Sequence, residues 1–312
     1  MKIQHKTLFG NFEYRKNERT GLCIICLLFL VILSGCAPLQ DNTPIPHDNP
    51  TPQTVVQPVN QTPPNITNTT MPPKEILLPI EGFAVYILDV GSSIITLNNK
   101  SILINAAPDA IKIIKTIRNL GISELDYIIL TNSEDGNIGG VAPIILRANP
   151  NKIIHSGIPS TSNYYKQYNT IYYPKNVTPV PFDDKLIFDD AVISLIVPYD
   201  DGQPLTADNN IIIKMSYGNT NILFMGNCGV DCESRISSSD IHTTILVSDG
   251  GCNSLSYLFL KESSPEHIIF TKEPCDITLN RVTGLAISVF ITKKEGDVVI
   301  TSTGISYEVL RT

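Results

Sequence analysis

A short polar segment, residues 132–137, carries the side chains best placed to do chemistry. It directly follows a mostly apolar run, residues 126–131, and holds two acids and two amides: Asn132, Glu134, Asp135 and Asn137. Carboxylate and amide oxygens are the ligands that hard cations such as Ca²⁺ and Mg²⁺ prefer. Together with Asp89 and Asp249, the two acids therefore make one candidate oxygen site for such a cation.

The elements around this segment predict where it lies in the fold. Residues 126–131 are rich in β-formers and read as a buried strand, and the Asp135-Gly136 pair then punctuates the chain before a helix-like stretch, residues 138–148. The polar segment thus sits at the carboxyl end of a strand, where α/β proteins usually build their sites.

From residue 82 onward, apolar runs with the periods of strands and helices alternate. Two sheets with helices outside them are the simplest packing of this pattern. Further strands are expected at residues 83–89, 94–97, 101–105, 152–155, 170–173, 185–188, 192–197, 210–216, 221–225, 243–248, 267–271, 285–292, 297–301 and 305–310, and further helices at 109–120, 230–236 and 254–261.

The polar segment resembles the metallo-β-lactamase superfamily, and most closely the extracytoplasmic domain of ComEC-type competence proteins. That family has Thr-His-x-His-x-Asp-His-Ile-Gly-Gly here. Thr131 and the Ile-Gly-Gly at residues 138–140 match in register, but the four ligand positions hold Asn132, Glu134, Gly136 and Asn137. The resemblance covers nearly all of residues 85–310. It implies an α/β fold, a metallo-β-lactamase-like α/β/β/α four-layer sandwich.

Later motifs of the family are altered in the same way. Asn105 replaces an acid, Asn227 stands where the metal-bridging Asp is expected, and Asp249 with Gly250 occupies the place of two histidines. None of the five histidines falls at a ligand position. Because clustered acids around a lost dication would repel one another, neutral amides are what an empty pocket tolerates. The resemblance therefore implies a dismantled metal site, with no bound metal and no cofactor.

Four cysteines fall a few residues after predicted strands, on the side of the former site. An even number of cysteines outside the cell most often forms disulfides, and Cys228 with Cys232 and Cys252 with Cys275 are the pairs closest in sequence. A four-thiolate zinc site and a nucleophilic cysteine are the alternatives, although no histidine partner lies beside any of the four.

The first 36 residues read as a signal sequence with a lipobox. Five basic residues precede an apolar run at residues 22–33, which is short for a membrane span, and Leu-Ser-Gly then leads to Cys36. Cys36 is the expected lipidation site, and an uncleaved membrane anchor is the alternative. Residues 37–78, rich in Pro, Thr and Asn, predict a disordered tether before the domain at 79–312. The expected localisation is the extracytoplasmic side of the cell membrane.

Charge and composition restrict the function. The net charge of −7, without a Lys/Arg cluster after residue 20, makes nucleic acid an improbable partner. A preserved fold with an erased site favours a non-catalytic binding or scaffold module, whose partner is an unknown small polar ligand or an envelope protein. The amides of residues 138–140 offer one place for an anionic group. The alternative is a metal-dependent hydrolase, of nuclease or phosphodiesterase type. It would bind Zn²⁺ or Ca²⁺ through ligands that the family does not use, such as Glu134 and Asp249.

Overall fold

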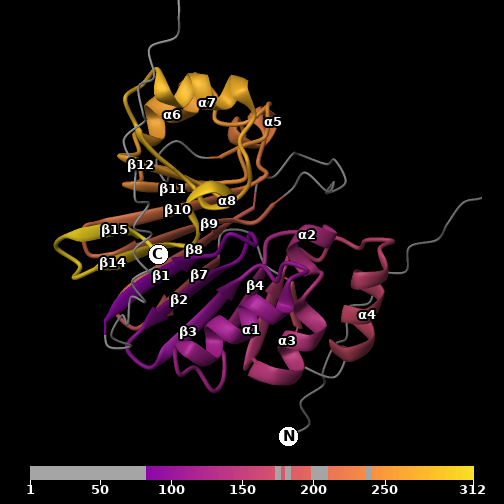
Figure 1. Cartoon of the computed structure of the whole chain (residues 1–312). Helices are drawn as coiled ribbons and strands as arrows, with labels where there is room; N and C mark the ends of the chain where they lie inside the picture. The colour runs from indigo at the N-terminus through magenta and orange to yellow at the C-terminus, as the bar shows by residue number, and fades with distance from the viewer. Residues whose placement is uncertain (1–81, 173–176, 180–183, 198–209, 237–240) are drawn as a thin grey trace, which may run out of the picture. The chain divides into compact units, whose positions relative to one another are not determined.

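The computed structural model describes residues 82–172, 177–179, 184–197, 210–236 and 241–312 (Figure 1). The predicted signal sequence at 1–36, with Cys36, and the tether at 37–78 lie outside the described residues. Within the described residues, no helix is both long and apolar enough to cross a membrane.

The first sheet has eight strands in the order β15-β14-β1-β2-β3-β4-β5-β6. β1 to β3 form an antiparallel meander, β3 to β6 run parallel, and the C-terminal hairpin β14–β15 extends the β1 edge. The strands are β1 (Phe83–Ile87), β2 (Ser93–Leu97), β3 (Lys100–Ile104), β4 (Tyr127–Leu130), β5 (Lys152–His155), β6 (Val177–Pro179), β14 (Val298–Ser302) and β15 (Tyr307–Arg311).

The second sheet has seven strands in the order β13-β12-β11-β10-β9-β8-β7. β7 to β10 are antiparallel, whereas β10 to β13 run parallel and have helices between them in the chain. The strands are β7 (Asp184–Phe188), β8 (Ala191–Ile196), β9 (Ile212–Tyr217), β10 (Thr220–Gly226), β11 (Ile245–Ser248), β12 (His267–Phe270) and β13 (Ser288–Ile291).

Helices cover the outer face of each sheet (Figure 1). Helix α1 begins after Asp109, whose side chain accepts a hydrogen bond from the Lys112 amide, and it buries Ile113 and Ile117 against the first sheet. The helices are α1 (Ala110–Asn119), α2 (Asp135–Ile138), α3 (Val141–Ala148) and α4 (Asn163–Tyr172) beside the first sheet, and α5 (Val230–Glu233), α6 (Tyr257–Ser263), α7 (Asp276–Thr283) and α8 (Thr292–Glu295) beside the second.

Three apolar clusters hold these layers together. One lies between the sheets and joins residues such as Val85 and Ile104 of the first to Ile213 and Val247 of the second. The other two lie between each sheet and its own helices. Because parallel strands covered on both faces are apolar throughout, β4 and β11 read as continuous apolar runs. The predicted α/β/β/α four-layer sandwich is confirmed.

Two predicted elements were wrong. Residues 170–173 read as a strand because they are rich in β-formers, but residues 170–172 end α4, in which Tyr165, Tyr168 and Ile171 face the core at helical spacing. The continuous helix at 138–148 is divided into α2 and α3 at Gly139 and Gly140. The backbone passes close to the segment after β3 at this point: a Cβ on Gly140 would lie 2.2 Å from the carbonyl oxygen of Ala107, so a larger residue does not fit there.

Three short elements were not predicted from the sequence: β6, α7 and α8. Helix α7 has a weak helical periodicity because it mixes Thr and Asn with only a few apolar residues. Tertiary contacts hold it in place. Val282 packs in the core behind the second sheet, and the Thr278 hydroxyl donates to the Gly251 carbonyl, 2.7 Å away.

Candidate functional site

The predicted site residues gather where parallel strands of both sheets end. Asn105 and Asn132 follow β3 and β4 of the first sheet, while Asn227 and Asp249 follow β10 and β11 of the second. The two edges are joined directly, because the Ile211 amide donates to the Thr131 carbonyl at 2.8 Å. The carboxyl ends of the strands therefore form one shared edge, as expected for a site in an α/β protein.

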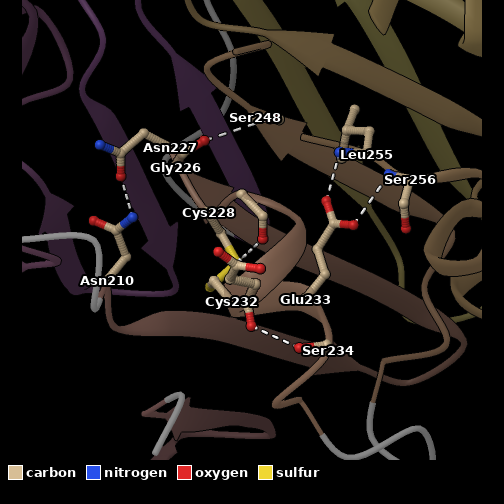
Figure 2. Close-up of a disulfide and its surroundings, with 12 residues drawn as sticks. Asn210, Gly226, Asn227, Cys228, Cys232, Glu233, Ser234, Ser248, Leu255 and Ser256 are labelled. Carbon is tan, nitrogen blue, oxygen red and sulfur yellow. Dashed lines mark hydrogen bonds between the residues drawn. A yellow bond between two sulfur atoms is a disulfide. The ribbon is translucent and has the colours of Figure 1, made fainter. Parts of the chain in front are cut away.

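Four residues form a closed hydrogen-bonded circuit at this edge, which we call the amide ring: Asn132, Asn210, Asn227 and Glu134. The Asn132 amide group donates to the Asn210 side-chain oxygen. Asn210 in turn donates to Asn227 (Figure 2). The Asn227 amide group reaches the Glu134 carboxylate at 3.1 and 3.2 Å. The Glu134 backbone N–H closes the circuit by donating to the Asn132 side-chain oxygen at 3.0 Å.

Two members of the amide ring are removed from water, while Glu134 and Asn227 are half-buried. Asn210 is fully buried and Asn132 is 2% exposed, so an unpaired polar atom at either residue would be costly. Asn137 adds a second bond to the Asn132 oxygen at 2.7 Å. Because each amide is both donor and acceptor, the ring satisfies its members without any cation. Three of the predicted positions, 132, 134 and 227, are thus brought together by Asn210.

Asn105 has a structural role in the same edge. Its φ of +57° lies in the left-handed region, which Asn tolerates better than most residues. Its side-chain oxygen accepts from both the backbone amide and the hydroxyl of Thr131, each at 2.9 Å. The side chain therefore fastens the end of β3 to the end of β4 and stands outside the amide ring.

Asp249 and Gly250 hold the corresponding end of β11. The Asp249 carboxylate accepts from the Thr271 hydroxyl at 2.6 Å and pairs with the Lys272 ammonium at 2.6 Å. Gly250 has φ +75°, and a Cβ there would lie 2.8 Å from Phe270 and from Pro274. A histidine at position 250 would therefore need the loop to move.

The space left between these groups is small. A cavity of about 20 Å³ lies beside Asn105, Thr131, Ser248, Asp249 and Thr271, which is room for about one water molecule. The lining of this cavity includes Asn105 and Asp249, two of the predicted positions, and none of the four residues of the amide ring.

A comparison with solved structures assigns the fold class. A mutant of the β-hydroxylase CmlA matches with a TM-score of 0.50 at 9% identity, over 70% of this chain and 54% of its own. The fold is metallo-β-lactamase-like.

Two further structures of this fold class are similar. YhfI from Bacillus subtilis, a metallo-β-lactamase fold protein, gives a TM-score of 0.48 at 12% identity, over 70% of this chain and 99% of its own. Igni18, a metallo hydrolase from Ignicoccus hospitalis, gives 0.46 at 10% identity, over 71% and 99%. No protein-family model and no curated protein matches the sequence. At these identities the likeness concerns the metallo-β-lactamase-like fold alone, and the closer resemblance to ComEC-type proteins stays a prediction.

The residues at the edge do not fit the metal centre that this fold implies. Such a centre needs converging imidazole, thiolate or carboxylate donors, whereas the ring offers amides that already bond one another. The described residues contain no group of three or more His, Cys, Asp or Glu side chains that could hold a metal ion. We therefore derive no chemistry through a metal at this edge.

The four acids of the candidate calcium site do not meet either. Asp89 lies 2.5 Å from the Lys112 ammonium, which also contacts Asp297 at 2.7 Å. Burial lowers the pKa of Lys112, but the hydrogen bonds to Asp297 and Asp89 outweigh it and leave the pKa raised. Glu134 belongs to the amide ring, Asp249 pairs with Lys272, and Asp135 is exposed at the start of α2.

Gly136 differs from the other altered positions. It is exposed, and a Cβ built on it would meet no atom within 4 Å. The space for a side chain is thus still present at position 136, while position 250 has lost it.

The cysteines form the pairs that sequence proximity favours. Disulfides join Cys228 to Cys232 and Cys252 to Cys275. The first is buried beside Asn227 at the start of α5 (Figure 2), and the second links the loop after β11 to the start of α7. With all four sulfurs bonded in pairs, neither a four-thiolate zinc site nor a cysteine nucleophile is formed.

A buried carboxylate that we did not predict also holds this loop. Glu233 is 6% exposed, and its oxygens accept from the backbone amides of Leu255 at 2.5 Å and Ser256 at 3.0 Å (Figure 2). From the other side, the Arg281 guanidinium donates to the carbonyls of Ser254 at 2.7 Å and Leu255 at 2.9 Å. The loop is therefore clamped between opposite charges. Glu233 follows Cys232 in the sequence, but no spacing pattern distinguishes it from a solvated acid.

Asn210 was not predicted as a member of the site, because it was taken only as the first residue of the strand expected at residues 210–216. The prediction of an anion-binding position at residues 138–140 is not supported. The amides of Ile138, Gly139 and Gly140 donate to the carbonyls of Glu134, Asp135 and Ala106 at 3.1, 2.9 and 2.8 Å. These amides are used within the fold.

Proposed function

We propose that this chain is a lipid-anchored, extracytoplasmic protein that uses a metallo-β-lactamase-like fold without metal-dependent catalysis, as a binding or scaffold module. The observation that carries the proposal is the amide ring. In place of charged donors around an ion, the strand ends hold Asn132, Asn210 and Asn227 bonded to one another and to Glu134.

Three features of the edge support a settled loss of catalysis. The loop after β11 is closed by a disulfide between Cys252 and Cys275, Gly250 leaves no space for a side chain, and the remaining cavity holds about one water. A hydrolase needs an open position at its metal for substrate and water. The edge instead has the features of a fixed structural joint between two sheets.

The proposal is tested by assaying turnover of the full-length protein in detergent. Bis(p-nitrophenyl) phosphate, single-stranded DNA and a chromogenic β-lactam are supplied with Zn²⁺, Mn²⁺ or Mg²⁺ in turn. We expect no turnover above the metal-containing buffer. Turnover that co-elutes with the protein and survives in the exposed-histidine control His242→Ala would contradict the proposal.

The alternative is a metal-dependent hydrolase, of nuclease or phosphodiesterase type, built on the two acids left at family ligand positions. Glu134 is only half-buried, and Asp249 lines the small cavity. This alternative requires that Glu134→Ala or Asp249→Ala lower the turnover by at least about 100-fold. If the parent protein shows no activity that these variants can lose, the alternative is excluded.

A further inference from the structure

A second concave surface lies at the opposite edge of the sheets from the amide ring. It is a hollow of about 530 Å³ lined by Thr244, Glu266, His267, Phe290 and Tyr307, with Asn219, Ile305, Ser306 and Val309 around them. Thr244 precedes β11 and His267 begins β12, whereas Asp249 and Thr271 follow the same strands. Because these strands run parallel over four residues each, the hollow and the amide ring are separated by their length, roughly 13 Å.

The hollow is built around a corner of three partly exposed rings. The His267 ring lies edge-on to Tyr307, with ring centres 5.7 Å apart, and tilted to Phe290 at 5.9 Å. The Tyr307 hydroxyl donates to the Glu266 carboxylate at 2.5 Å. Burial and the nearby Glu266 carboxylate raise the pKa of Tyr307, so the phenol stays a neutral donor. A carboxylate keeps acceptor capacity beyond that single bond.

The charged side chains that line the hollow and its neighbour are acidic. Glu266 is exposed in the hollow, and an adjoining hollow of about 450 Å³, which shares Ser306 and Tyr307, adds Glu308. Neither lining contains a Lys or Arg among the described residues. Aromatic faces attract organic cations, and a carboxylate beside them strengthens that attraction and disfavours anions.

A cation of the chain itself already uses one of these rings. The Arg311 guanidinium lies over the Phe290 ring, 5.0 Å from its centre, and pairs with Glu295. The same chemistry that holds Arg311 at the rim is thus available in the hollow, from Tyr307 and His267 with Glu266 as the counter-charge. We propose that this hollow is a binding site for a ligand bearing an alkylammonium group.

The two turns beside the hollow are fixed against each other, so the surface is formed in advance. The Asn219 amide donates to the Gly304 carbonyl at 2.7 Å, and the hydroxyls of Thr220 and Ser302 lie 2.6 Å apart. A Cβ on Gly218 would approach the Gly304 carbonyl oxygen to 2.0 Å. A preformed site loses little conformational entropy when a ligand binds.

The test compares choline with 3,3-dimethyl-1-butanol, which has the same shape without the charge. Binding to the full-length protein is followed by calorimetry or by NMR line broadening, up to about 50 mM of each probe. We expect millimolar choline binding, and at least about tenfold weaker binding of the uncharged probe. Glu266→Gln should weaken choline binding about tenfold, while Glu124→Gln, an exposed acid that lines neither hollow, should leave it unchanged.

A variant at an available aromatic ring separates this site from a purely electrostatic one. Tyr307→Leu should weaken choline binding several-fold while the unfolding midpoint shows that the variant is folded. Equal binding of the two probes, no choline binding at the highest concentration, or binding of a neutral disaccharide in preference to choline would each overturn the proposal. Because the hollow lies away from the amide ring, these outcomes do not depend on whether the protein is catalytically inactive.

Discussion

At the scale of single residues, the amide ring depends on Asn210 more than on any predicted position. This side chain is fully buried, accepts from Asn132 and donates to Asn227. Its removal leaves the buried Asn132 amide donor and the half-buried Asn227 acceptor without their partner.

We therefore expect Asn210→Ala to lower the free energy of unfolding by about 2–4 kcal/mol, since each unsatisfied buried group costs about 1–3 kcal/mol. Urea denaturation followed by circular dichroism measures the change. The matched control is Asn99→Ala, in an exposed turn, which should change stability by less than about 0.5 kcal/mol. Equal effects of the two substitutions would show that the ring does not stabilise the fold.

Single residues also show the limits of sequence-based prediction. The neutral replacements at 105, 132 and 227 are evident from the sequence, since each stands in a segment that aligns with a motif of the family it resembles. Their different roles are not evident, because Asn105 bonds Thr131 across two strands while Asn132 and Asn227 are joined through Asn210 and Glu134. Long-range hydrogen bonds of this kind leave no local pattern. The clash that fixes Gly250 is likewise a property of its neighbours Phe270 and Pro274.

At the scale of elements, the contact between β5 and α4 is sensitive to pH. His155 ends β5, its ring lies edge-on to Tyr168 of α4 at 6.0 Å, and its Nδ1 accepts from the Gly157 amide. Burial lowers the pKa of His155 below the ordinary value of 6.5. The unfolded chain therefore binds this proton more readily than the folded protein, and stability is lost as the pH falls below about 6.5.

The expected result is a smaller loss of stability in His155→Gln than in the parent protein when the pH is lowered from about 7.5 to 5.5. Thermal unfolding midpoints at several pH values provide the measurement. His242→Gln, at an exposed histidine, should follow the parent curve. A parent-like slope in His155→Gln would mean that this histidine is not buried in the neutral form.

The two disulfides constrain loops of different length. Cys228 and Cys232 are 4 residues apart, whereas Cys252 and Cys275 are 23 apart. In the chain-entropy model the short bridge stabilises by about 2 kcal/mol and the long one by about 3 kcal/mol. Cys252→Ala with Cys275→Ala should thus destabilise the protein more than Cys228→Ala with Cys232→Ala, as measured by urea denaturation. The reverse order would indicate that core packing of Cys228 dominates.

Element prediction from the sequence succeeded where periodicity is strong. The strands β1 to β5 and the amphipathic helix α1 are clear from apolar spacing, and the structure adds the Asp109 cap at the start of α1. Prediction failed for α4, where the β-rich composition of residues 170–172 was given more weight than the helical spacing of Tyr165, Tyr168 and Ile171. The glycines at 139 and 140 were assigned to a continuous helix because their close approaches, to Pro108 and to the Ala107 carbonyl respectively, involve a different segment of the chain.

At the scale of the whole molecule, the proposal places the domain outside the membrane on a lipid anchor. The sequence predicts modification of Cys36 after removal of residues 1–35, a part of the chain outside the described residues. Cys36→Ser should shift the protein from the detergent phase to the aqueous phase in detergent partitioning, because the acyl chains supply the membrane affinity. Retention of this variant in the membrane fraction at its full-length mass would show that the apolar run at 22–33 stays as an anchor.

The most direct test of the account is the metal content of the purified protein, measured by elemental analysis together with a count of free thiols. The protein is prepared under oxidising conditions, exposed to Zn²⁺, Mn²⁺ and Fe²⁺, and then dialysed without chelator. A strand edge closed by the amide ring and two disulfides predicts far less than one metal ion per chain and no free thiol. One or two tightly held ions per chain, lost on Glu134→Ala or Asp249→Ala, would contradict it.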